Sequence, residues 1–296
     1  MIVVRNTRKT LFSWGEIWSE SFGNPSDPFV LMVMAASRQG IYWNTSFCEA
    51  LARQGFYVVR FDHRDTGLST HINFNANPYR YIDMVDDLRG LIYDYGQTSV
   101  HILGSGMGGH IAQLLAIESP QFVRSMVIIN STWNVTPILA QRVNYILPSS
   151  DPDVYDALMR RGTILLNDPN YFQSKLDMLR ILNGKDVLFD EEEWGALIIE
   201  ERARTNRMHS PTFFHHHILA GVLSNSCFES EKISQPALII HGASNPFVLV
   251  EHAYATHQKI PMSALLVIEE MGHLHGKSYN KILSEPIVSH WQQCHN

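Results

Sequence analysis

The chain has 296 residues, of which 45% are hydrophobic and 18% are charged, and this composition excludes a disordered polypeptide. Its formal net charge of -6 disfavours nucleic acid as a partner, because phosphate backbones attract basic surfaces. The N-terminal residues lack the apolar run of a secretory signal, and no apolar run approaches the length of a membrane span. We therefore expect a soluble, cytoplasmic protein with no membrane partner.

Short apolar and β-branched runs alternate with longer segments of helical periodicity, which is typical of a mostly parallel sheet covered by helices on both faces. The predicted strands are Phe29–Ala36, Phe56–Asp62, Ser99–Gly104, Ser125–Asn130, Ala237–Gly242 and Ala264–Glu269. The predicted helices are Trp43–Gly55, Arg80–Tyr95, Met107–Glu118 and Tyr279–Gln293. Pro286 should bend the last helix or mark its first turn.

Residues 133–231 interrupt this alternation. They are rich in Leu, Ile and Arg, contain several prolines, and offer helical segments but no clear strand. We therefore expect an α/β core formed by residues 1–132 and 232–296, with a helical cap inserted at 133–231.

The segment His101–Gly109 has the form of a nucleophile elbow, in which an apolar strand ends in G-x-S-x-G and a helix follows. Gly106 occupies the serine position of this motif. An elbow residue lies on a strained turn, and glycine adopts such backbone angles without penalty, so the replacement relieves roughly 1 kcal/mol or more. The pattern predicts a relaxed turn without a nucleophile.

The same segment allows two alternatives. Ser105 is a candidate substitute nucleophile, although adjacent residues at a strand end point in different directions. Gly104-Ser-Gly106-Met-Gly-Gly109 also matches the dinucleotide fingerprint G-x-G-x-x-G. That fingerprint requires an acid about 20 residues later, where this chain has Asn130-Ser-Thr132. We therefore favour a site without a dinucleotide or other cofactor.

Backbone donors for an oxyanion hole remain in the sequence. Such a site needs one N–H from the residue after the elbow position and one from the loop after an early strand. Met107 would give the first, and Ala35 or Ala36 would give the second. Because these donors survive the loss of a side chain, we expect a pocket that still binds a carbonyl or carboxylate oxygen.

Two late positions complete the order of a catalytic triad. Asn245 stands after the strand Ala237–Gly242, where a triad acid is expected, and His273 follows the last strand as the base. We expect the amide oxygen of Asn245 to accept a hydrogen bond from the imidazole, without stabilising an imidazolium as a carboxylate does. The alternative acids, which we expect to be solvated surface charges, are Glu251, Glu269 and Glu270.

The histidine run His215–His217, with His209 nearby, is a candidate metal site. Consecutive helical residues point about 100° apart, so such a run rarely converges on one ion. We expect no metal, and one or two of these histidines lining the pocket. The cysteines lack a C-x-x-C pair and are expected to be free thiols: they are Cys48, Cys227 and Cys294.

Four motifs together resemble the α/β-hydrolase group that includes aclacinomycin methylesterase: Glu16–Pro28, Arg60–Ser69, the elbow at Gly104–Gly109, and Met271-Gly-His273. Leu179–Gly184 with Phe189-Asp190 resembles the cap of that group. The resemblance extends from about Glu16 to Trp291. It implies an α/β-hydrolase fold with a helical cap and a pocket for an apolar ester or carbonyl compound.

The resemblance places the nucleophile at Gly106, the acid at Asn245, the base at His273, and the oxyanion donors at Met107 and the Met34-Ala-Ala segment. Only the histidine is chemically preserved. The leading hypothesis is a protein of esterase ancestry that binds a small apolar ester or carbonyl ligand, or that uses His273 in a non-hydrolytic reaction. The alternatives are a methylesterase-like carboxylic-ester hydrolase that uses Ser105 or His273-activated water, and a dinucleotide-binding protein.

Overall fold

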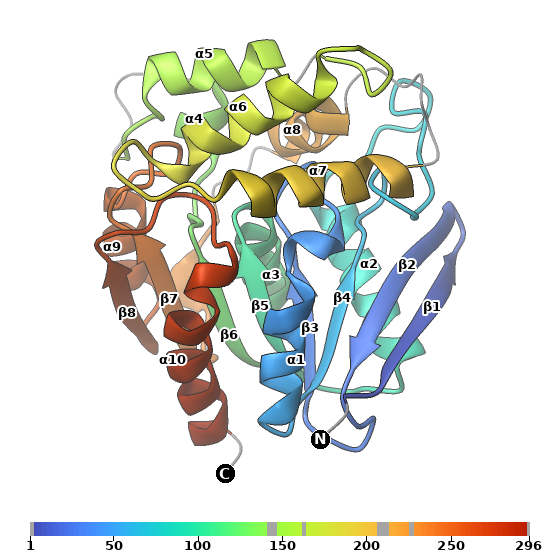
Figure 1. The fold of residues 1–296 in the computed structure, drawn as a ribbon. Helices are drawn as coiled ribbons and strands as arrows, with labels where there is room; N and C mark the ends of the chain where they lie inside the picture. The colour runs from blue at the N-terminus through green and yellow to red at the C-terminus, as the bar shows by residue number, and fades with distance from the viewer. Residues whose placement is uncertain (1–2, 141–146, 162–163, 206–212, 225–227, 295–296) are drawn as a thin grey trace.

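The computed structural model describes residues 3–140, 147–161, 164–205, 213–224 and 228–294, and an eight-stranded sheet forms its centre (Figure 1). The strands lie in the order β1-β2-β4-β3-β5-β6-β7-β8. β3 to β8 are parallel, whereas β1 pairs antiparallel with β2 and β2 pairs antiparallel with β4. The strands are Arg5–Phe12 (β1), Gly15–Phe22 (β2), Phe29–Val33 (β3), Tyr57–Phe61 (β4), Val100–Ser105 (β5), Val123–Ile129 (β6), Ala237–Gly242 (β7) and Ser263–Ile268 (β8).

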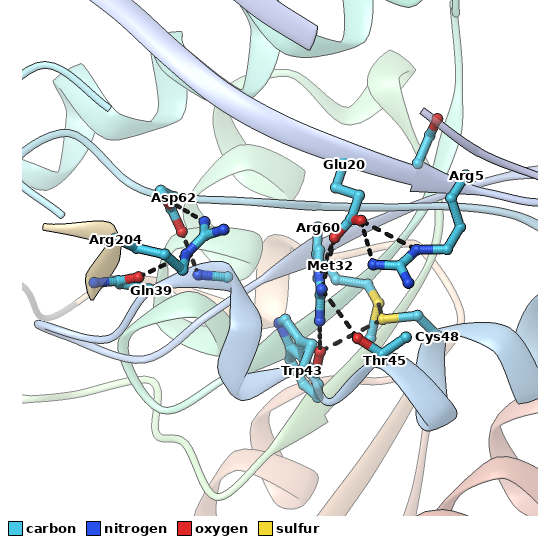
Figure 2. A network of polar contacts seen from close by, with 12 residues as sticks. Arg5, Glu20, Met32, Gln39, Trp43, Thr45, Cys48, Arg60, Asp62 and Arg204 are labelled. Atoms are coloured by element: carbon cyan, nitrogen blue, oxygen red, sulfur yellow. Dashed lines mark hydrogen bonds and ion pairs between the residues drawn. The ribbon is translucent and has the colours of Figure 1, made fainter. Parts of the chain in front are cut away.

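The predicted strands coincide with β3 to β8, the parallel part of the sheet. Their continuous apolar runs are the signature of strands buried on both faces. β1 and β2 were not predicted, because most residues of β1 are exposed and β2 buries polar side chains. One of these is Glu20, whose carboxylate contacts Arg5 and Arg60 at 2.6 Å each (Figure 2).

Helices cover both faces of the sheet. α1 (Thr45–Arg53) and α10 (Asn280–Gln293) contribute to the apolar cluster on one face. α2 (Tyr81–Asp94), α3 (Met107–Glu118) and α9 (Glu251–Lys259) contribute to the cluster on the other. α10 contains Pro286 in its interior. Short 3-10 helices span Gly40–Tyr42, Pro120–Phe122, Ser230–Lys232 and Lys277–Tyr279.

Between β6 and β7 the chain forms α4 (Thr136–Ala140), α5 (Pro152–Arg161), α6 (Tyr171–Asn183), α7 (Glu191–Arg204) and α8 (Phe213–Ser224). We call these helices the helical segment. Figure 1 shows that they lie together above the ends of the parallel strands from which α3 and the other connections start. Among the residues that the structure describes, no helix is long and apolar enough to cross a membrane.

Candidate active site

Gly106 forms a sharp turn between β5 and α3, with φ 51° and ψ -119°. A positive φ strains any residue with a side chain, so the turn suits glycine. A Cβ at this position would lie 3.1 Å from the Cβ of Ala35 and 3.7 Å from Nε2 of His273. The backbone of the turn is held by Ser131, whose hydroxyl donates to the carbonyl of Gly106 at 2.6 Å. The elbow geometry is therefore present, and its side-chain position faces His273.

Asn245 and His273 contact each other through nitrogen atoms. Nδ2 of Asn245 lies 3.2 Å from Nδ1 of His273. Oδ1 of Asn245 accepts hydrogen bonds from the backbone N–H groups of Phe247, at 3.1 Å, and Val248, at 3.0 Å. Only the oxygen of an amide can accept hydrogen bonds, so these backbone contacts fix its orientation. The NH₂ group of Asn245 therefore donates to Nδ1 of His273.

This orientation corrects the expectation that the amide oxygen of Asn245 accepts from the imidazole, because that oxygen is already engaged by two backbone donors. A neutral imidazole that accepts at Nδ1 carries its proton on Nε2. Nε2 is also the atom of His273 that faces the side-chain position of residue 106, at 3.7 Å. A general base needs a free lone pair at that point, whereas His273 presents a proton there. In this state the imidazole is a hydrogen-bond donor to the pocket.

His273 is buried, and its position is fixed from both sides. Burial lowers the pKa of this imidazole well below its usual value, and the charge of Arg38 acts in the same direction, so the ring is neutral. Its backbone N–H donates to the carbonyl of Leu182 in α6 at 2.8 Å. Asn130, at the end of β6, donates to the carbonyl of Gly272 at 3.0 Å and accepts from the N–H of Gly242 at 2.9 Å.

The positioning role of Asn130 was not predicted. In the sequence, Asn130 stands at the position where a dinucleotide-binding fold has the acid that binds the ribose, and no other role was predicted for it. Its backbone has φ 50°, a conformation that asparagine tolerates better than most residues, and its side chain is fully buried. An asparagine directly after a buried strand was the available signal.

Ser105 lies on the far side of the turn from the elbow position. Its hydroxyl is buried and contacts Nε2 of His275 at 3.0 Å. Ser105, His275 and His273 border a small cavity of about 20 Å³, whereas Gly106 faces a larger one. His275 stacks on Trp43 at 4.7 Å between ring centroids. The candidate substitute nucleophile is thus paired with His275 rather than with His273, the predicted triad base.

Gly106 and His273 line a cavity of about 160 Å³. Ala35, Ala36 and Met107, the residues expected to carry the oxyanion donors, line the same cavity. Met107 begins α3, and the first N–H groups of a helix have no acceptor within it. Much of the remaining wall is apolar and comes from the helical segment and the connection between α5 and α6: it includes Ile138, Leu139, Leu158, Ile164, Leu166, Met178 and Leu182.

Two histidines form hydrogen bonds with the backbone of the loop after β3, which carries Ala35 and Ala36. Nε2 of His63 donates to the carbonyl of Met34 at 2.9 Å. Nδ1 of His217 accepts from the N–H of Ser37 at 2.9 Å, while its Nε2 donates to the carbonyl of Arg64 at 2.9 Å. His217 therefore braces this loop from α8, and the structure gives it a positioning role that was not predicted.

The motif Asp62-His-Arg-Asp-Thr-Gly67 links this loop to the helical segment. Asp62 forms an ion pair with Arg204, at the end of α7, at 2.8 Å, and Gln39 lies beside them (Figure 2). Asp62 also accepts from the N–H of Gly40 at 2.7 Å. Asp65 contacts Nδ1 of His216 in α8 at 3.3 Å. The motif thus positions the pocket walls.

None of the three alternative acids lines the large cavity. Glu251, Glu269 and Glu270 are exposed, as expected of surface charges. Among the described residues, no group of His, Cys, Asp or Glu has the arrangement of a metal site. Cys48 is buried and free, and Cys294 is a free thiol of intermediate exposure. His209 and Cys227 lie outside the described residues.

The glycines of the dinucleotide fingerprint have packing roles. A Cβ at Gly104 would lie 2.5 Å from the carbonyl oxygen of Gly108, and one at Gly109 would lie 2.7 Å from the Cβ of Ser131. These positions need glycine because α3 packs closely against the sheet at the elbow. The fingerprint therefore has an explanation that involves no phosphate.

Comparisons with known proteins agree on the type of fold. A family model described as alpha/beta hydrolase fold matches residues 39–275. Rhodomycin D methylesterase DauP from Streptomyces sp. (strain C5) is 27% identical, over 93% of this chain and 94% of its own. Rhodomycin D methylesterase DnrP from Streptomyces peucetius is 26% identical over the same shares. Among solved structures, the 2-hydroxy-6-oxo-6-phenylhexa-2,4-dienoate hydrolase from Rhodococcus sp. strain RHA1 superposes with a TM-score of 0.76 at 15% identity, covering 98% of this chain and 100% of its own.

Proposed function

Because this chain belongs to the alpha/beta hydrolase family, we propose that it binds a small apolar ester or carbonyl ligand in the inherited pocket and does not perform serine-based hydrolysis. Residues 133–231 serve in this proposal as a cap over the pocket. Two relatives that align over nearly the whole chain are rhodomycin D methylesterases, and this supports an esterase ancestry for the pocket. A cytoplasmic location remains part of the proposal.

The proposal rests on the two groups that face each other at the elbow, residue 106 and the imidazole of His273. Gly106 has no hydroxyl, and the histidine that would activate one carries its proton on the facing nitrogen. Serine hydrolysis needs the reverse arrangement, a hydroxyl that gives its proton to a free imidazole nitrogen. The Nε2–H of His273 is instead suited to hold a carbonyl oxygen, together with the N–H of Met107.

The test compares p-nitrophenyl ester hydrolysis by the wild-type chain and by the Gly106→Ser, Asn245→Asp double variant, each with and without His273→Ala. We expect wild type to hydrolyse the ester no faster than its His273→Ala variant. The double variant should gain turnover that His273→Ala removes, because the imidazole can then act as a base. Covalent labelling of wild type by a serine-directed phosphonate would overturn the proposal.

A second candidate function is weak hydrolysis through Ser105, which the 3.0 Å contact with Nε2 of His275 favours. Any wild-type turnover that depends on this pair should be lost in Ser105→Ala and in His275→Ala but kept in His273→Ala. A hydrolytic water activated by His273 would give the opposite pattern. The three single variants therefore separate the two routes.

A further inference from the structure

Arg38 is a buried cation that lines both cavities. Its residue exposure is 7%, and it lines the large cavity with Gly106 as well as the small one with Ser105 and His275. Among the residues that the structure describes, Nη1 has no hydrogen-bond partner. The guanidinium stacks on the ring of Tyr42, with Cζ 4.6 Å from the centroid. A stacking contact satisfies none of the N–H groups of the guanidinium.

Among the described residues, the one carboxylate that lines the large cavity is already engaged. Glu201 accepts from the hydroxyl of Tyr42 at 2.8 Å and pairs with Lys175 at 3.1 Å. Within the described residues, no ion pair includes Arg38. Burying a charged group without a partner is costly, so a buried arginine on a pocket wall indicates an anionic partner that comes from outside the chain.

The other polar groups of the pocket favour the same charge. Nε2–H of His273 is a donor, and the N–H of Met107 lies at the positive N-terminus of α3. Asn245 replaces the carboxylate that a triad would hold behind the imidazole. A negative charge at that position would repel an anion bound at His273, and the neutral amide removes this repulsion.

We propose that the ligand of this pocket is an apolar carboxylic acid whose carboxylate pairs with Arg38 and accepts a hydrogen bond from Nε2–H of His273. The inference rests on the proposed function and names its ligand class. A guanidinium forms paired hydrogen bonds with the two oxygens of a carboxylate, and the apolar wall from the helical segment holds the rest of the molecule. The carboxylate is the form in which an esterase releases its product, so the site retains the product-like state.

The experiment measures binding of 2-naphthoate and of its neutral analogue 2-naphthamide by titration calorimetry at neutral pH. We expect wild type to bind the acid about tenfold or more tightly than the amide, because hydrogen bonds to charged groups are the stronger ones. Arg38→Gln should remove this preference while leaving the affinity for the amide within a factor of about two. Arg38→Lys should keep part of the preference. Asn245→Asp should weaken binding of the acid selectively.

Arg202→Gln is the matched control, since Arg202 is an exposed arginine of α7. It should leave both affinities unchanged. Equal affinity of wild type for acid and amide, or an unchanged preference in Arg38→Gln, would overturn the inference and leave the proposed function intact. Absence of saturable binding of both compounds would count against both. Phosphonate labelling would count against the proposed function alone.

Discussion

The atom that residue 245 presents to Nδ1 of His273 determines which nitrogen of the imidazole carries the proton. A carboxylate at this place would accept the Nδ1 proton of the imidazole, whereas the amide of Asn245 donates to Nδ1 because its oxygen already accepts from Phe247 and Val248. The proton consequently resides on Nε2, opposite Gly106. The amide at position 245 thus makes Nε2 of His273 a proton donor, where a carboxylate would leave it a proton acceptor.

The tautomer of His273 is directly measurable. In wild type, long-range ¹H–¹⁵N NMR of histidine-labelled protein should show a neutral ring protonated at Nε2. Asn245→Asp should move the proton to Nδ1 and raise the pKa of the ring, since an adjacent carboxylate favours the charged form. The same spectrum of His273→Gln identifies the resonance. A wild-type ring protonated at Nδ1 would contradict the arrangement described above.

Gly106→Ala should destabilise the fold by about 1–3 kcal/mol in urea unfolding, because a residue with a side chain is strained at this backbone conformation. The added Cβ would also lie 3.1 Å from the Cβ of Ala35. Gly55→Ala is the matched control: its φ is +85°, and nothing lies within 4 Å of the added atom. It should therefore report backbone strain alone. A Gly106→Ala variant as stable as wild type would show that the elbow has no strain to relieve.

Arg38→Met should raise the free energy of unfolding of the ligand-free protein by about 1 kcal/mol or more, since an apolar side chain replaces a buried, unpaired charge. Thermal unfolding in the absence and presence of 2-naphthoate would check this. The variant should be more stable without the acid and gain less from adding it. A less stable variant would indicate that the stacking of Arg38 on Tyr42 outweighs the cost of burying its charge.

At the scale of elements, periodicity predicted the parallel strands, because each buries a short apolar run. Periodicity did not predict the two N-terminal strands. The edge strand β1 is mostly exposed, and β2 buries Glu20 in ion pairs that form only in the folded chain. The elbow, Asn245 and His273 were identified from their order in the chain. The direction of the Asn245 amide was not predictable, because it depends on two backbone N–H groups. The burial of Arg38 was not predictable either, because it depends on how the folded chain packs around this residue.

The link between α7 and the loop after β4 rests on a buried charge pair. Asp62 is fully buried, and Arg204 is its ion-pair partner at 2.8 Å. Arg204→Met should cost about 3 kcal/mol in urea unfolding, because it leaves a buried carboxylate without its counter-ion. Arg202→Met, on the exposed side of the same helix, should change stability by less than about 0.5 kcal/mol. Similar changes in the free energy of unfolding for the two substitutions would contradict the role of Asp62 in linking this loop to α7.

At the scale of the whole molecule, parallel strands bring distant segments to one edge of the sheet. Residues 35, 106, 245 and 273 meet there because β3, β5, β7 and β8 all end at that edge. Chain order within a known pattern was therefore sufficient to assemble the site. The buried histidines that support it, His63 and His217 among them, were not predicted, because their partners are backbone atoms of other segments.

These buried histidines should make the protein sensitive to acid. Burial lowers the pKa of His63 to about 3 and those of His110, His217, His241 and His275 to about 4. Below the ordinary histidine pKa of about 6.5, these histidines bind protons in the unfolded chain but stay neutral in the folded chain. The free energy of unfolding therefore falls as the pH is lowered from about 6.5 to the pKa values of the folded state. A histidine with a folded-state pKa of 4 loses about 2 kcal/mol between pH 7 and pH 5. Asp87, whose pKa burial raises to about 6, opposes this by about 1 kcal/mol.

Because several histidines act in one direction and Asp87 in the other, we expect a net loss of several kcal/mol between pH 7 and pH 5. Urea unfolding at both values, at constant ionic strength, measures the loss, and the slope with pH gives the protons taken up on unfolding. More than one proton should be taken up near pH 5. His110→Gln should reduce this number by about one, because the ring of His110 is fully buried and does not itself line the cavity. A midpoint unchanged between the two pH values would mean that these histidines are charged in the folded protein, and His273 would then lose its standing as a neutral donor.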